Sequence, residues 1–264
     1  MYEFSYHRPA SVADAATLLA SHEEAKLLAG GQTYLPTLKQ RLAQPSDLID
    51  LGGIAELKGI KEEGGGITIG AMTRHADVAH SELVKRVIPA LAALAELIGD
   101  PAVRNRGTIG GSISNNDPAA DYPGAVLALN ATIRTNKREI AADAFFTAMF
   151  ETALARDEIV TAVHFPKADK AAYEKFPNPA SRYSMAGVFV ARSGNGVRVG
   201  VTGAGPTAFR WIDAENALAG NFSPAALDGL TLAADGLNAD LHASAEYRAN
   251  LVKVMAKRAV AAAT

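Results

Sequence analysis

The stretch Val103–Asp121, VRNRGTIGGSISNNDPAAD, decides how this chain folds and what it holds. Gly107, Gly110 and Gly111 stand among small polar residues and are followed by asparagines and aspartates. Such a run has almost no apolar area to bury, so it cannot form a core element. Small residues with free backbone donors are typical of a chain that wraps a polar ligand. The alternative is a surface loop, and loops of this length are usually functional.

A second glycine pair lies earlier, in Leu27–Leu42, LLAGGQTYLPTLKQRL. A strand ending at Ala29 leads into Gly30 and Gly31, and a helix is expected from about Thr33. Glycine removes the Cβ that would obstruct a ligand, and the free N–H groups of a helix start suit a diphosphate. Strand–glycine–helix turns are common, however, so this pair alone favours an ordinary turn over a phosphate site.

Composition limits the chemistry that the chain can carry. The 264 residues are 48% hydrophobic and 20% charged, with a net charge of −2 that gives no electrostatic case for nucleic acid. No apolar run approaches the ~20 residues of a membrane span, and MYEFSYHRPAS is not a secretory signal, so a cytoplasmic protein is expected. Cysteine is absent and the six histidines form no HxxxH pair, which predicts no metal site and no iron–sulfur cluster. Any redox chemistry must then use an organic cofactor.

The first two thirds of the chain alternate between helical and strand patterns. A helix over residues 9–19, strands over 25–30 and 46–51, and a helix with Leu35, Leu38 and Leu42 on one face predict a βαβ-like unit. A hairpin over residues 57–73 follows, whose triple glycine is interpreted as a turn because two adjacent glutamates would repel an anion. The remaining predictions are a helix over 82–99 interrupted at Pro89, a helix-to-strand or strand pair over 124–135, a helix over 142–150 and a strand over 158–166.

The last third differs in pattern, with a boundary near residue 170. Strands are predicted over residues 184–192, 196–205 and 208–212, the first two joined as a hairpin around Ser193–Gly196. Helices are predicted over 213–220, 224–237 and 244–263, which together indicate a separate α+β domain. Gly203, Gly205 and Ala208 fit a dinucleotide fingerprint, but a strand rather than a helix follows, so a turn is expected.

Three ring-bearing residues are candidates for a role at a binding site. His75 begins a polar helix and is expected to cap it or to lie on the surface. Tyr183 and Tyr247 are each compatible with shielding a cofactor or with filling the core.

The two glycine stretches together resemble a known family. AGGQT at residues 29–33, followed by VRNRGTIGGSISNNDPAAD, is similar to the flavin subunit of the molybdenum hydroxylases, which include aerobic carbon monoxide dehydrogenase and xanthine dehydrogenase. The likeness spans the chain, since residues 172–191 and 244–251 also resemble that family. It implies an α+β fold: a two-part FAD-binding domain of the PCMH/VAO type (residues 1–55 and 56–170), then a smaller domain (171–264) with a three-stranded antiparallel sheet and a helical bundle.

The resemblance implies a binding site for noncovalent FAD. The first loop around the diphosphate would comprise Lys26, Leu27, Leu28, Ala29, Gly30, Gly31, Gln32 and Thr33. The second would comprise Gly107, Thr108, Ile109, Gly110, Gly111 and Ser112. Asp121 would bind toward the sugar, Ile159 and Val160 would pack near the rings, and Lys175 would reach the flavin edge. The family often has serine at position 33 and asparagine at position 112, so both positions keep a hydrogen-bonding side chain.

The implied function is electron transfer within a larger enzyme. A [2Fe–2S] small subunit would deliver electrons to the FAD on this chain, and a molybdopterin large subunit would oxidise the substrate. The expected assembly is a heterohexamer with two copies of each subunit, and no catalytic residue is assigned to this chain. The alternatives are a self-contained flavin oxidoreductase acting directly on a small substrate and a scaffold that has lost the cofactor.

Overall fold

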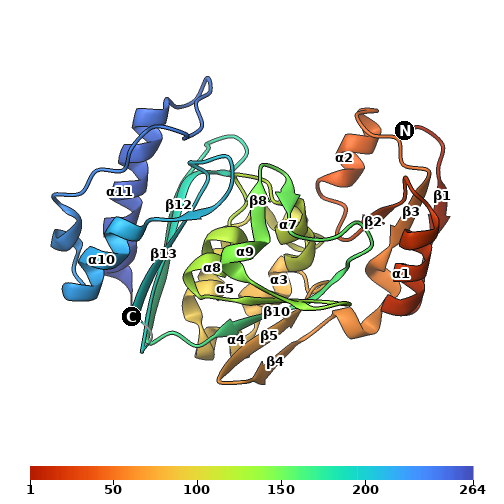
Figure 1. Ribbon diagram of the computed structural model, residues 1–264, viewed down its shortest axis with the longest axis horizontal. Helices are drawn as coiled ribbons and strands as arrows, with labels where there is room; N and C mark the ends of the chain where they lie inside the picture. The colour runs from red at the N-terminus through yellow and green to blue at the C-terminus, as the bar shows by residue number, and fades with distance from the viewer. Residues whose placement is uncertain (195, 264) are drawn as a thin grey trace.

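The computed structural model describes residues 1–194 and 196–263, and its strands form three main sheets in chain order (Figure 1). The first sheet is parallel, in the order β1-β3-β2, and carries the predicted βαβ unit. Ser11 caps its first helix by accepting a hydrogen bond from the Asp14 backbone, and Ala15 and Leu19 bury one helix face. The second helix ends at Lys39, so Leu42, expected on its apolar face, is 73% exposed. The elements are β1 (Ser5–His7), α1 (Val12–Ser21), β2 (Lys26–Leu28), α2 (Tyr34–Lys39), β3 (Asp47–Asp50) and two 3₁₀ turns, Leu51–Gly53 and Ala55–Leu57.

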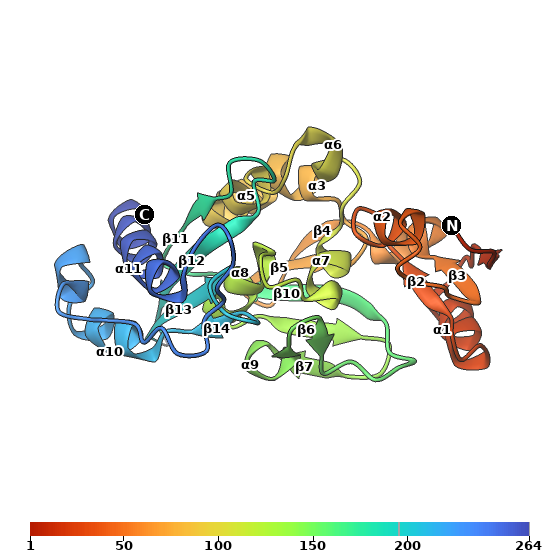
Figure 2. The same ribbon diagram turned by 90° about the horizontal axis from the view of Figure 1, so that it is seen from above.

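The second sheet is antiparallel, in the order β4-β5-β10-β6-β7, and most of the helices of this part cover one of its faces (Figure 2). The predicted hairpin forms its first two strands, and the helix-to-strand interpretation of residues 124–135 is confirmed by α8 and β6. Its strands are β4 (Ile60–Glu63), β5 (Gly66–Gly70), β6 (Thr132–Thr135), β7 (Glu139–Ala141) and β10 (Val160–Pro166). The helices are α3 (His75–His80), α4 (Glu82–Val87), α5 (Pro89–Glu96), α6 (Pro101–Arg104), α7 (Ile109–Asn115), α8 (Tyr122–Ala128) and α9 (Ala142–Phe145).

Two helices in this part are shorter than the sequence predicts. The predicted interruption at Pro89 is a complete break, because Ile88 leaves the helical region and Pro89 starts α5. The helix predicted over 142–150 ends at Phe145, and the chain continues as a small hairpin of β8 (Phe146–Ala148) and β9 (Glu151–Thr152). Aromatic residues at 145 and 146 suit either structure, and pairing with β9 decides the outcome.

The third sheet is antiparallel, in the order β11-β12-β13-β14, and lies between α8 on one side and α10 and α11 on the other (Figure 1). It has four strands rather than the three predicted, because Lys170–Pro177 adds an edge strand. Its elements are β11 (Lys170–Pro177), β12 (Ser184–Ser193), β13 (Gly196–Thr202), β14 (Phe209–Arg210), α10 (Ile212–Gly220) and α11 (Ala245–Ala262). Asn195, in the predicted hairpin turn, and Thr264 lie outside the described residues.

The end of the chain departs further from prediction. Only Pro224–Leu227 of the helix expected over 224–237 is helical, as a single 3₁₀ turn, so one long helix rather than a bundle of helices covers this sheet face beside α10. Gly229 and Gly236, which is at φ +79°, disfavour a continuous helix there. The G-x-G-x-x-A stretch at 203–208 is a turn leading to β14, as expected.

Candidate functional site

A cleft of about 470 Å³, here called the main cleft, lies where the first sheet meets the helices of the second. Its size is typical of a small-molecule site. Both glycine stretches line it. The first connects β2 to α2, and the second runs from the loop after α6 into the first turn of α7 (Figure 2). The predicted residues among its lining are Lys26, Leu27, Leu28, Ala29, Gly30, Gly31, Gln32, Thr33, Gly107, Thr108, Gly110, Gly111, Ser112, Ile159 and Val160.

The two glycine stretches touch each other directly. A Cβ on Gly30 would overlap the carbonyl oxygen of Arg106 and lie 2.8 Å from the Cα of Gly107. A Cβ on Gly111 would lie 3.1 Å from that of Ala29. Glycine is therefore needed at position 30 for backbone-to-backbone contact, and the two bends form one continuous wall of the main cleft.

The two bends differ in their free hydrogen-bond donors. Within the described residues, the backbone N–H groups of Gly30, Gly31, Gln32 and Thr33 have no protein acceptor. In the second bend, by contrast, Ile109 donates to Thr73, Gly110 to Ala71, Gly111 to the Thr108 hydroxyl and Ser112 to the Thr108 carbonyl. The expectation of unpaired backbone donors in the second stretch is thus wrong for these four residues. The first bend supplies the free N–H groups, and the second contributes the side chains of Ser112, Ser114 and Asn115.

His75 forms part of the cleft lining, and the prediction of a capping or surface residue is wrong. Its side chain is 4% exposed at the first turn of α3, and its backbone N–H donates to the carbonyl of Gly107. A Cβ on Gly107 would lie 2.6 Å from His75 Nε2, so the imidazole packs against the second bend. Burial and the positive charge of Arg104 lower the pKa of His75 to about 4, so the ring is neutral near pH 7. The buried Nδ1 atom has no hydrogen-bond partner.

Three of the predicted binding residues are absent from the cleft lining. Ile109 is fully buried in the core of the second part, as is Ile113, so the expectation that this run cannot form a core element is wrong for α7. Asp121 and Lys175 form a buried ion pair, with Lys175 Nζ 3.0 Å from Asp121 Oδ1, and Asp121 Oδ1 also accepts a hydrogen bond from the Tyr173 hydroxyl. Ala120, which directly precedes Asp121 in the sequence, does line the cleft. Their side chains are engaged with each other, which is why neither is directed into the cleft.

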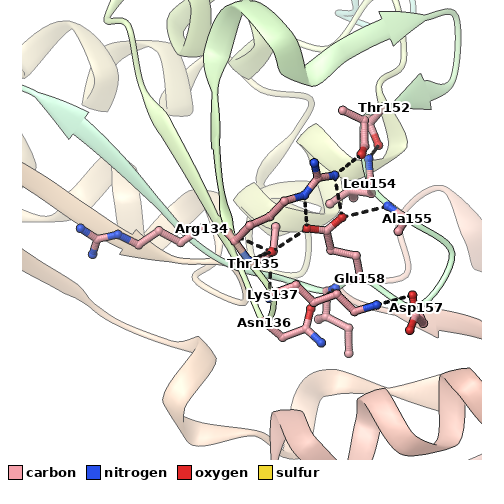
Figure 3. A network of polar contacts seen from close by, with 12 residues as sticks. Arg134, Thr135, Asn136, Lys137, Thr152, Leu154, Ala155, Asp157 and Glu158 are labelled. Carbon is pink, nitrogen blue, oxygen red and sulfur yellow. Dashed lines mark hydrogen bonds and ion pairs between the residues drawn. The ribbon is translucent and has the colours of Figure 1, made fainter.

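Ile159 and Val160 line the cleft as predicted, and the structure adds Glu158 beside them. Glu158 is 3% exposed, and its carboxylate accepts hydrogen bonds from Arg138, Thr135 Oγ1 and the Ala155 backbone (Figure 3). These bonds lower the pKa of Glu158 to about 2, Arg138 contributing most. The network fixes the segment that presents Ile159 and Val160 to the cleft.

Several lining residues could not have been found from the glycine pattern. Phe150 lies at the tip of the β8–β9 hairpin, and Leu154 lies in the segment after it. Asp117 comes from the loop between α7 and α8, and Tyr183 directly precedes β12. Tyr183 is 49% exposed and lines the cleft, whereas Tyr247 packs edge-on against Phe176 far along the chain. Burial and the nearby carboxylates of Asp117 and Asp121 raise the pKa of Tyr183.

Comparison with known proteins identifies the family of the chain. Residues 2–168 match the FAD binding domain in molybdopterin dehydrogenase, and residues 171–263 match the CO dehydrogenase flavoprotein C-terminal domain. The chain belongs to this family. The predicted resemblance, the α+β fold with two kinds of domain and FAD as cofactor are thereby confirmed.

Relatives match over nearly the whole chain. The carbon monoxide dehydrogenase medium chain of Hydrogenophaga pseudoflava is 39% identical over 98% of this chain and 96% of its own. The nicotine 6-hydroxylase medium subunit of Paenarthrobacter nicotinovorans is 38% identical over 97% of this chain and 95% of its own. A solved structure of carbon monoxide dehydrogenase from H. pseudoflava superposes with a TM-score of 0.89, at 39% identity over 99% of this chain and 97% of that chain.

The residues of the main cleft fit FAD. The four free N–H groups of the first bend suit the oxygens of a diphosphate. Ile159, Val160 and Tyr183 provide apolar and aromatic surface for planar rings. In the described residues no group of three or more metal-ligating side chains occurs, and none of their helices is long and apolar enough to cross a bilayer.

Proposed function

We propose that this chain is the FAD-carrying electron-transfer subunit of a molybdenum hydroxylase complex. In this proposal a [2Fe–2S] small subunit reduces the flavin, a molybdopterin large subunit oxidises the substrate, and an external acceptor takes the electrons. The assembly is a heterohexamer with two copies of each chain, working in the cytoplasm. The names of the relatives support it, since they are medium or FAD-binding subunits of dehydrogenases and hydroxylases.

The observation that carries the proposal is the contact between the two glycine bends around one cleft. The free donors of Gly30, Gly31, Gln32 and Thr33 bind the diphosphate, and Ser112 with Thr108 closes the same wall. The remaining predicted residues are proposed in the same roles: Lys26, Leu27, Leu28 and Ala29 flank the first bend, Gly107, Ile109, Gly110 and Gly111 shape the second, and Ile159 and Val160 pack on the rings. Asp121 and Lys175 act from behind the wall, adjacent to the sugar and the flavin edge.

The cofactor is held noncovalently. The chain contains no cysteine to form a thioether. Bound FAD supplies a ring system that accepts electrons from one partner and releases them to another. The protein part of this work is to hold the diphosphate and to exclude water with apolar side chains. We divide the chain accordingly into residues 1–55, 56–170 and 171–264.

The test is to add the reduced [2Fe–2S] partner subunit, freed of chemical reductant, to the FAD-loaded chain without oxygen. The proposal predicts rapid loss of the visible flavin absorbance, and an oxidised partner subunit serves as the control. A flavin that stays oxidised with the reduced partner contradicts the role. Flavin reduction by a small organic substrate added to this chain alone would instead support a self-contained oxidoreductase.

A further inference from the structure

Phe150 is an exposed aromatic residue at the tip of the β8–β9 hairpin. Its side chain is 55% exposed, yet it lines the main cleft. The preceding residue, Met149, is 46% exposed but lines a second cavity of about 520 Å³ instead. The tip therefore presents two large apolar side chains to two different cavities, and only Phe150 faces the main cleft.

The backbone holds Phe150 in an unfavourable conformation. Its φ of +58° lies in the left-handed region, which bulky side chains rarely adopt. Glycine would occupy this position without strain. Strained residues of this kind persist where the surrounding structure fixes them, and they concentrate at functional sites.

Asn116 is the residue that fixes the tip. It is fully buried, and its side-chain amide donates to the carbonyls of Ala148 and Glu151, at 2.7 Å each, on either side of the tip. The backbone N–H of Phe150 in turn donates to the carbonyl of Asn116. Because Asn116 directly follows α7, the hairpin tip is attached to the same element that carries the second glycine bend.

Tyr183 is a second aromatic side chain that the same segment brings to the cleft. The N–H of Ser184, its neighbour, donates to the carbonyl of Ala119. Tyr183 is also half exposed and lines both cavities. Residues 116–119 are thus bonded to the two segments that carry these aromatic rings, the tip of the β8–β9 hairpin and the start of β12, and both rings line the main cleft.

We propose that Phe150 is an aromatic cover of this cleft, whose phenyl ring packs on the flavin of bound FAD and limits the access of solvent and small oxidants. The inference rests on the proposed function, because it requires FAD in the main cleft. The phenyl ring of Phe150 would stabilise the planar flavin by stacking on it and would exclude water from that face. The strain at position 150 is the structural cost of presenting that ring at the mouth of the cleft.

The test compares Phe150→Ala, Phe150→Gly and the neighbouring control Met149→Ala in the full chain. Two quantities are measured: the dissociation constant of FAD by titration, and the quenching of bound flavin fluorescence by iodide. Both Phe150 variants are expected to weaken FAD binding about three- to tenfold, the loss typical of one aromatic contact. Both should also raise the iodide quenching constant severalfold, whereas Met149→Ala should match the native chain in both measurements.

Phe150→Gly separates this role from a purely structural one. Glycine tolerates the positive φ, so the cofactor-free variant should unfold at or above the temperature of the native protein while its bound flavin is more accessible. Native-like binding and quenching in both Phe150 variants would overturn the inference, as would equal effects in Met149→Ala. If the native chain itself fails to bind FAD, the proposed function is what fails.

Discussion

The backbone of Gly30 packs against the backbone of Gly107, with only 2.8 Å between the Cα of Gly107 and the place where a Cβ on residue 30 would stand. The two residues are far apart in the sequence and belong to different sheets' loops. Their contact is what turns two ordinary-looking bends into one binding wall, and it makes position 30 sensitive to a single methyl group.

Gly30→Ala is expected to separate the two bends. The added methyl would overlap the carbonyl oxygen of Arg106, and overpacking of this kind costs about 1–3 kcal/mol of stability. FAD affinity should fall at least tenfold, because the free donors of the first bend shift relative to the second. Gly220→Ala is the matched control, since nothing lies within 4 Å of a Cβ there. FAD titration and thermal unfolding of both variants check this, and native affinity in Gly30→Ala contradicts it.

Breaking the ion pair of Asp121 and Lys175 should strongly destabilise the protein. Both side chains are about 5% exposed, so removing either partner leaves the other buried and unpaired, at a cost of about 3–5 kcal/mol. Lys175 Nζ also donates to the carbonyls of Leu97 and Arg182, which links β11 to the second part of the chain. Asp121→Asn, Lys175→Met and the double variant, compared by denaturant unfolding, form a cycle. The double variant should lose clearly less free energy of unfolding than the two single variants lose together. Losses that simply add would show that the two residues are not coupled.

His75 makes stability depend on pH in a defined direction. Its pKa in the folded protein is about 4, below the 6.5 of the free side chain, so the unfolded chain binds the proton more readily. The stability contributed by neutral His75 is therefore complete above pH 6.5 and is lost as the pH falls from 6.5 towards 4. Cofactor-free His75→Gln should show a flatter dependence over this window in denaturant unfolding. His80→Gln, at the exposed end of the same helix, should retain the native slope, and a native slope in His75→Gln would refute the assignment.

The contact between Arg138 and Glu158 should contribute more to stability than the neighbouring ion pair of Lys137 and Asp157. Arg138→Gln leaves the buried Glu158 carboxylate without its main donor, so the free energy of unfolding is expected to fall clearly. Lys137→Gln breaks only the exposed contact with Asp157 and should lower the free energy of unfolding little or not at all (Figure 3). Denaturant unfolding of the two variants near pH 7 makes the comparison, and equal losses would contradict it.

Acid unfolding provides a second measure of the same contact. The pKa of Glu158 is about 2 in the folded protein and 4.5 when free, so its stabilisation is complete above pH 4.5 and disappears as the pH falls towards 2. Arg138→Gln removes the largest cause of that shift. The variant should therefore lose less stability than the native protein over this range.

Much of the site could be predicted from the sequence because its signals are local. The two glycine bends are marked by their small polar residues and by a motif shared with a known family, and the same family resemblance marks Ile159 and Val160. His75 was misplaced because its burial comes from a long-range contact with Gly107, while the polar residues around it suggest a surface helix. Phe150 carries no sequence signal at all, since its position is set by the β8–β9 pairing and by the amide of Asn116.

The fold shows the same division between local and long-range information. The strands β12 and β13 were predicted from their apolar residues, which are continuous over residues 185–191 in β12 and alternate as Val197, Val199 and Val201 in β13. The edge strand β11 was missed because its Lys–Ala–Ala–Tyr–Glu–Lys sequence has no strong alternation, and it forms by pairing with β12. The segment 224–237 is rich in alanine and leucine, which favour a helix. Its two glycines disfavour one, and only Pro224–Leu227 forms a helical turn.

A crystal structure of the FAD-loaded chain would show directly whether the two glycine bends hold the same diphosphate. We predict diphosphate oxygens within hydrogen-bond distance of backbone N–H groups of Gly30–Thr33, with Thr108–Ser112 contacting the same diphosphate from the second bend. A diphosphate bound elsewhere, or held by only one of the two bends, would contradict the central claim.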